Sequence, residues 1–259
     1  MRGTLADITV VAEGDRWVVI NKPPGVLSVP GLGEANQQCA PLWCRQRYPG
    51  CTGPITVHRL DMDTSGLLLM ALEPRAQREL SRQFEVRTVG KAYEALVRGH
   101  VRRDAGTIEL PLRPDVSRRP YQVVDFSFGR PAVTHFAVME RTQYTQPDGV
   151  TVPATRLELV PHTGRTHQLR VHCAISRRGL IEMGIAGDYT PEGKVIQGLA
   201  GGAAHENSRA EMDEGHPIFG DVLYGVRGDS PRLLLHAREL SFDDPTTGKR
   251  VEVRSGAGF

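Results

Sequence analysis

The sequence predicts an α+β fold with mainly antiparallel strands. Residues 7–14 and 16–21 are rich in apolar side chains on either side of an acidic glycine turn, so they predict a pair of strands. Residues 67–72 form an unbroken apolar run, which is typical of a strand buried on both faces. Further strands are expected at 91–99, where apolar and polar residues alternate, and at 132–141 and 154–160.

Helical patterns are fewer than strand patterns. Residues 36–48 predict a short helix that ends before a Pro-Gly pair. A second helix is expected to open at Pro74, since proline is tolerated in the first turn, and its buried side carries Ala76, Leu80 and Phe84. Its other side carries three arginines at helical spacing, which favours a solvated face or one that meets phosphates.

Composition sets broad limits on function. The chain has 259 residues, 39% hydrophobic and 24% charged, which is ordinary for a globular protein with a substantial core. Its formal net charge is only +2, but the 32 Lys and Arg residues are clustered, and local patches attract a polyanion more than net charge does. Binding to nucleic acid is therefore compatible with the sequence.

Targeting and metal signals are weak. No apolar signal region begins the chain, and no run approaches the roughly 20 apolar residues that span a bilayer. The four cysteines lack the spacing of a zinc ribbon, and we expect reduced thiols in a cytoplasmic protein. We expect no metal site and no cofactor.

The polar segment at residues 57–66 precedes the most apolar run of the chain. Its position predicts that Asp61 is held near a buried sheet, with Arg59 as a permanent cation beside it. A structural Arg/Asp loop that satisfies its own backbone would explain a lone Arg-x-Asp equally well. The whole segment, however, resembles the His-Arg-Leu-Asp-x-x-Thr-Ser-Gly signature of the RluA-type pseudouridine synthases.

That resemblance implies that Asp61 is the catalytic residue. It extends to an Asn-Lys-Pro-x-Gly loop at residues 21–25, and to a Lys-x-Tyr-x-Ala segment in which Tyr93 sits over the target base. An aromatic ring there can stack on uracil, and its hydroxyl can relay a proton. From the residues alone, no specific role for Lys22 follows.

A second cluster occupies residues 161–172. Thr163 and Thr166 are plausible caps of a helix, whose free N–H groups would face a phosphate. Its three histidines are five residues apart, a spacing that does not place them on one helical face as metal ligation would require. The segment resembles the synthase motif Gly-Arg-x-His-Gln-Leu-Arg-x-His, which implies that Arg170 pairs with the catalytic carboxylate.

We expect a single catalytic domain spanning residues 1–259. The exception to the family pattern is a Gly/Ala-rich excursion at about 179–215, which we expect on the surface. The resemblance resumes with a His-Pro-Ile-x-Gly-Asp turn at 216–221. The expected fold is a long mixed, mainly antiparallel sheet in two lobes, with helices outside and a basic cleft between the lobes that contains Asp61.

The implied activity is isomerisation of a specific uridine to pseudouridine in a stem-loop of tRNA or 23S rRNA. The nucleotide must leave the helical stack, and Arg59 would fill the vacated space, with His58 as its neighbour on the RNA. Arg165 is assigned to backbone phosphate, and Arg119 lies in a basic loop that is a second candidate contact. We expect no membrane association, no obligatory protein partner and a monomeric protein.

Two other functions remain compatible with the sequence. Asp61 and Asp63 are two residues apart and could hold Mg²⁺ in a metal-dependent phosphodiesterase or glycosyl transferase. Alternatively, the chain could be a non-catalytic RNA-binding protein on the same fold, since fold does not guarantee activity. The enzyme is favoured because Asp61, Tyr93 and Arg170 are all present in their motifs.

Overall fold

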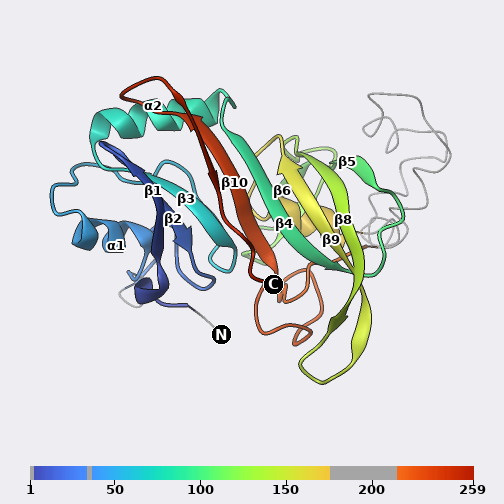
Figure 1. Ribbon diagram of the computed structural model, residues 1–259. Coiled ribbons are helices and arrows are strands. Elements are labelled where there is room, and N and C mark those ends of the chain that lie inside the picture. Colours follow the sequence, from blue (N-terminus) through green and yellow to red (C-terminus); the bar gives the residue numbers. More distant parts are fainter. Residues whose placement is uncertain (1–2, 34–36, 176–214) are drawn as a thin grey trace. The chain divides into compact units, whose positions relative to one another are not determined.

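The computed structural model describes residues 3–33, 37–175 and 215–259 (Figure 1). Two compact units divide the chain, the first comprising Met1–Glu94 and Leu235–Phe259 and the second Ala95–Leu234. Strands, mostly antiparallel, outnumber helices in the described residues, which confirms the predicted α+β class. The predicted excursion at about 179–215 lies outside the described residues, apart from its last position.

The first unit is built on a sheet whose strand order is β1-β2-β3-β10, with β11 paired to β10. A short 3-10 helix, η1 (Leu5–Asp7), precedes it. The strands are β1 (Thr9–Gly14), β2 (Trp17–Lys22), β3 (Ser65–Ala71), β10 (Leu235–Asp243) and β11 (Arg250–Arg254). All described pairings are antiparallel except that of β3 with β10, which is parallel. The two predicted N-terminal strands are confirmed, and β10 and β11 form a hairpin.

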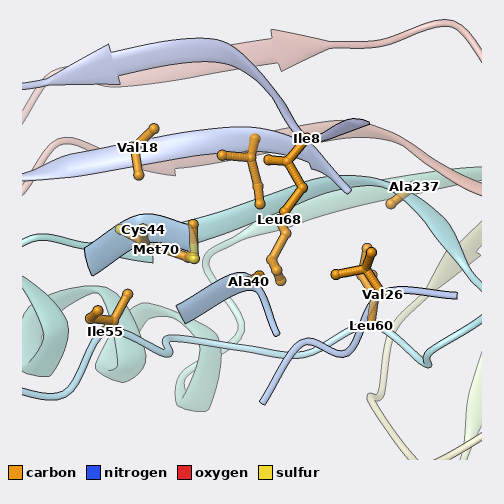
Figure 2. Close-up of a cluster of buried hydrophobic side chains, with 11 residues drawn as sticks. Ile8, Val18, Val26, Ala40, Cys44, Ile55, Leu60, Leu68, Met70 and Ala237 are labelled. Atoms are coloured by element: carbon orange, nitrogen blue, oxygen red, sulfur yellow. The ribbon is translucent and has the colours of Figure 1, made fainter. Parts of the chain in front are cut away.

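Both faces of this sheet are covered, because β2 and β3 carry apolar side chains in unbroken runs. One face presents Val18, Ile20, Leu68 and Met70 to α1 (Ala40–Arg47), which contributes Ala40 and Cys44 (Figure 2).

The opposite face presents Val19, Leu67 and Leu69 to α2 (Pro74–Glu85), and is closed by Phe242 of β10. The expectations for β3 and α2 are confirmed. The helix predicted for residues 36–48 is shorter, since residues 37–39 are not helical.

The second unit is organised around a long hairpin of β8 (Val133–Thr145) and β9 (Thr151–Pro161), drawn in yellow-green in Figure 1. β4 (Gly90–Arg98) carries the chain into this unit, and β5 (Ala105–Glu109) pairs with β8. Both strands are longer than the expected 132–141 and 154–160, because they stay paired out to Thr145 and Thr151. The basic loop region contains a small hairpin, β6 (Leu112–Pro114) with β7 (Gln122–Val124).

The helix expected after residue 163 is α3 (Gln168–Ala174). The prediction that a threonine caps it is wrong. The N-cap residue is His167, in the left-handed conformation with a φ of 54°, and no side chain bonds the first turn in capping geometry. Thr163 is used elsewhere: its hydroxyl accepts from the Val133 N–H and donates to Gln168 Oε1.

One glycine fixes the start of β3. Gly66 has a φ of +112°, and a Cβ built there would lie 2.4 Å from the Ala237 carbonyl oxygen on the parallel neighbour β10. Only glycine tolerates both the backbone conformation and the close approach. The Gly of the signature is therefore required by the packing of two strands.

Replacing Gly66 with alanine is expected to destabilise the protein by about 3–5 kcal/mol, since left-handed strain and a backbone clash add together. Urea unfolding of Gly66→Ala measures this. Gly50→Ala is the matched control, because Gly50 has no positive φ and nothing lies within 4 Å of a Cβ at its position. Equal stability of the two variants would refute the explanation.

Candidate active site

Asp61 lies in a loop whose main chain is fixed on both sides of it. The Ser28 hydroxyl donates to the Leu60 carbonyl at 2.8 Å and accepts from the Leu60 N–H at 3.0 Å. Both residues are buried. Two hydrogen bonds to one hydroxyl hold residue 60 against the core, and this leaves the next side chain, Asp61, to project at intermediate exposure.

The second anchor is the side chain of Lys22, at the end of β2. Its ammonium donates to the carbonyls of Val26 at 2.8 Å, Met62 at 2.9 Å and Pro23 at 3.0 Å, and the residue is 0% exposed. The Gly25 N–H also donates to the Met62 carbonyl. Met62 therefore receives two hydrogen bonds from the Asn-Lys-Pro-x-Gly loop.

Burial lowers the pKa of Lys22 to about 7, while the carboxylates of Asp63 and Asp61 act to raise it. A lysine that makes three hydrogen bonds but sits away from water loses hydration of its charge, and the nearby negative charges offset part of that loss. Lys22 thus links the two acidic side chains of the loop electrostatically while it fixes the main chain between them.

The third anchor lies where the loop enters β3. The Ser65 hydroxyl is 2.9 Å from His236 Nδ1 and 3.3 Å from the Leu235 carbonyl, and His236 Nε2 is 3.3 Å from the Ser255 hydroxyl. Ser65 and His236 face each other in the parallel register of β3 and β10. This buried polar chain holds the end of the loop against the C-terminal part of the sequence.

Tyr93, on β4, belongs to the same unit as Asp61. Its ring packs against the core cluster that contains Leu60, Leu68 and Val26. Burial and the charge of Asp61 both raise the pKa of Tyr93, so the phenol keeps its proton at neutral pH. The structure thus brings the predicted Asp61 and Tyr93 within electrostatic reach of each other.

His58 and Arg59 differ in their surroundings. His58 Nε2 accepts from the Leu69 N–H at 3.0 Å, and its ring stacks on Phe84 with centroids 4.4 Å apart. Burial lowers the pKa of His58 to about 3, so the ring is neutral, with its proton on Nδ1. Arg59 is exposed, and within the described residues its side chain has no hydrogen bond or ion pair. RNA contacts by either residue stay predictions.

Arg170 lies in the second unit, on α3. It forms a two-pronged ion pair with Asp221, with Nε–Oδ2 at 2.8 Å and Nη2–Oδ1 at 2.6 Å, and both side chains are buried. Asp221 Oδ1 also accepts from the N–H groups of Leu223 and Tyr224. The predicted pairing of Arg170 with Asp61 joins two units and stays a prediction, whereas the pairing with Asp221 is a feature of the second unit alone.

Two further arginines were expected to meet RNA. Arg165 Nε donates to the Pro131 carbonyl at 3.0 Å, which fixes its side chain beside β8. In the basic loop, Arg113 and Arg118 pair with Asp125 and Asp115.

Arg119, in contrast, is exposed and forms no ion pair with any residue that the structure describes. Its contact with RNA stays a prediction.

Across the described ranges, no three His, Cys, Asp or Glu side chains are arranged to hold a metal ion. The four cysteines are free thiols. His167 and His172 of the histidine-rich segment have separate partners: His167 contacts the Tyr224 hydroxyl, and His172 lies between Thr134 and the Leu110 carbonyl. No described helix is long and apolar enough to cross a membrane.

Sequence reasoning missed three residues that anchor the Asp61 loop in the first unit, Lys22, Ser28 and His236. In the second unit it missed Asp221 as the ion-pair partner of Arg170. Lys22 and Asp221 stand in motifs that the resemblance covers. Each is a charged residue in an otherwise apolar or turn-forming motif, and that contrast could have indicated a structural role. Ser28 contacts Leu60, which is 32 positions away along the chain, and His236 contacts Ser65, which is 171 positions away. No local sequence pattern indicates such distant partners.

The chain is similar over most of its length to known proteins. Residues 16–175 match the family model described as RNA pseudouridylate synthase. The chain is 37% identical over 255 residues to the dual-specificity RNA pseudouridine synthase RluA of Pasteurella multocida (strain Pm70), and 34% identical to that of Escherichia coli (strain K12). Each alignment covers 97% of this chain and 94% of the relative.

A solved structure is also similar. Human RNA pseudouridylate synthase domain containing 1 matches with a TM-score of 0.69 and 29% identity, covering 99% of this chain and 86% of the human one. The chain belongs to the RNA pseudouridylate synthase family. Its activity class is that of an isomerase.

Replacing Lys22 with methionine keeps the length of the side chain but leaves the buried Val26 carbonyl without its donor, and the Met62 carbonyl with the Gly25 N–H alone. We expect a loss of about 2–4 kcal/mol in the free energy of unfolding, because buried acceptors without a partner are costly. Urea unfolding measures it, with the exposed Lys249→Met as the control. A variant as stable as the control would contradict the anchoring role.

Proposed function

We propose that this protein converts a uridine in a structured RNA to pseudouridine, with the carboxylate of Asp61 as the catalytic group. The observation that supports the assignment is the loop itself. Three buried anchors fix residues 60, 62 and 65 and leave Asp61 displayed beside Tyr93. A preorganised carboxylate beside an aromatic ring is what a reaction on a turned-out base requires.

The chemistry breaks the N1–C1′ bond of uridine and joins C5 to C1′ after the base has turned. The product is an isomer of the substrate, so no electrons are gained or lost. Asp61 would act on C1′, on the ring or on a sugar proton, and each route uses its ionised form. The neutral phenol of Tyr93 would stack on the base and relay a proton.

The remaining predicted residues would serve the RNA. Arg59, exposed and two positions from Asp61, would occupy the space that the base leaves. Arg119 and Arg165 would contact backbone phosphates of the RNA. His58 would contact the RNA next to Arg59. Arg170 would pair with Asp61 through guanidinium donors beyond those that bind Asp221.

The RNA is proposed to be a stem-loop of tRNA, of 23S rRNA, or of both. The similar RluA proteins are named dual-specificity RNA pseudouridine synthases, which supports more than one RNA substrate. Recognition would rest on the shape of the loop and a few exposed bases. We place the action in the cytoplasm, where these RNAs are found, and propose that the protein works as a monomer without a cofactor.

Asp61→Asn is expected to abolish pseudouridine formation in purified tRNA and rRNA while RNA affinity changes by less than about threefold, because the amide keeps the shape but cannot act as a carboxylate. The readout is pseudouridine content after incubation with excess enzyme, alongside equilibrium binding of the same RNA. The neighbouring Asp63→Asn is the control and should keep most of the activity.

Persistent turnover by Asp61→Asn would contradict the assignment. Loss of wild-type activity in the presence of a chelator would favour the metal-dependent alternative. RNA binding without pseudouridine formation by the wild-type protein would favour the non-catalytic one.

A further inference from the structure

The C-terminal end of α2 carries an arginine at a position that glycine normally occupies. Arg87 follows the helix with a φ of 62°, in the left-handed region. The Arg87 N–H donates to the Phe84 carbonyl and the Thr88 N–H to the Gln83 carbonyl, which is the hydrogen-bond pattern of a glycine-terminated helix. An L side chain is strained in this conformation, so the arginine costs stability that a glycine would not.

Lys91, at the start of β4, is a second cation at the same place. Its Nζ lies 5.8 Å from the centre of the Phe84 ring, and in the described part of the chain no carboxylate or hydrogen-bond acceptor pairs with it. Arg87 likewise has no partner there. Burial and the charge of Arg87 both lower the pKa of Lys91, so the two cations repel each other without a compensating anion.

We propose that Arg87 and Lys91 together bind one backbone phosphate of the RNA, next to the nucleotide that reacts. An anion between them would remove the repulsion and supply the partner that the chain lacks. A phosphate oxygen accepts hydrogen bonds from both a guanidinium and an ammonium. The inference deepens the proposed function and rests on it.

The position of the pair fits a phosphate and not the base. Successive strand residues alternate, so Lys91 and Tyr93 project from the same side of β4, about 7 Å apart along the strand. Tyr93 is the residue within reach of Asp61. The Phe84 ring, which Lys91 contacts, also stacks on His58. His58 precedes Arg59 in the loop. The two cations lie where α2 leads to β4 (Figure 1), and in the proposed complex they would meet the RNA next to the nucleotide that reacts.

Arg87→Gly separates binding from folding. The substitution relieves left-handed strain, so we expect the Tm to rise by about 2–4 °C. It also removes one phosphate contact, so affinity for end-labelled bulk tRNA should fall about fivefold at 0.1 M KCl. The slope of log K against log salt should decrease by about 0.7. A more stable protein that binds RNA less tightly is a result that misfolding cannot produce.

Lys249→Gln is the control, because Lys249 is exposed in the same unit and its side chain has no partner among the described residues. Its affinity and salt slope should stay closer to wild type. If Lys249→Gln weakens binding as much as Arg87→Gly does, the effect belongs to the general charge of the surface and the local site is refuted.

Lys91→Met is the second variant, since it keeps the aliphatic contact with Phe84 and removes the charge. It should reduce the salt slope by a similar amount, and the double variant with Arg87→Gly should lose less than the sum, because one phosphate is shared. Unchanged binding in both single variants, with wild-type protein that forms pseudouridine, overturns this inference alone. Wild-type protein that binds RNA but forms no pseudouridine overturns the proposed function, while the binding comparison still tests the phosphate site.

Discussion

The structure depends most on a buried ammonium. Lys22 is fully enclosed and donates to three carbonyls, one of which belongs to Met62 in the signature loop. Enclosing a charged amine is unfavourable by itself, and it persists here because the carbonyls and the charges of Asp61 and Asp63 surround it. The loop that carries the catalytic candidate therefore cannot shift without leaving that charge unsatisfied.

Other features of the first unit serve the same constraint. Ser28 fixes the residue before Asp61, and the Ser65–His236 contact fixes the entry into β3. Gly66 allows β10 to approach β3 closely in parallel register. Segments near the beginning and the end of the sequence thus converge on one short loop. This convergence fixes the main chain around Asp61 in the absence of RNA, as the proposed catalytic role requires.

The sequence predicted those helices and strands that have local signals. The apolar run of β3 and the proline that opens α2 are visible in the residues themselves. The start of α3 was missed, because a histidine in the left-handed conformation replaces the expected threonine cap. The ion pair of Arg170 with Asp221 was also missed, since Asp221 is 51 residues away and only the fold brings them together. The roles of Lys22 and Arg87 depend on burial and backbone conformation, which composition does not reveal.

The most direct test of the central claim is pseudouridine mapping of total RNA from cells with and without this gene, complemented by the wild-type gene or by its Asp61→Asn variant. We expect one or a few uridines in tRNA or rRNA to lose modification when the gene is lost and to regain it only with the wild-type gene. A map that does not change on loss of the gene, or one restored by Asp61→Asn, would contradict it.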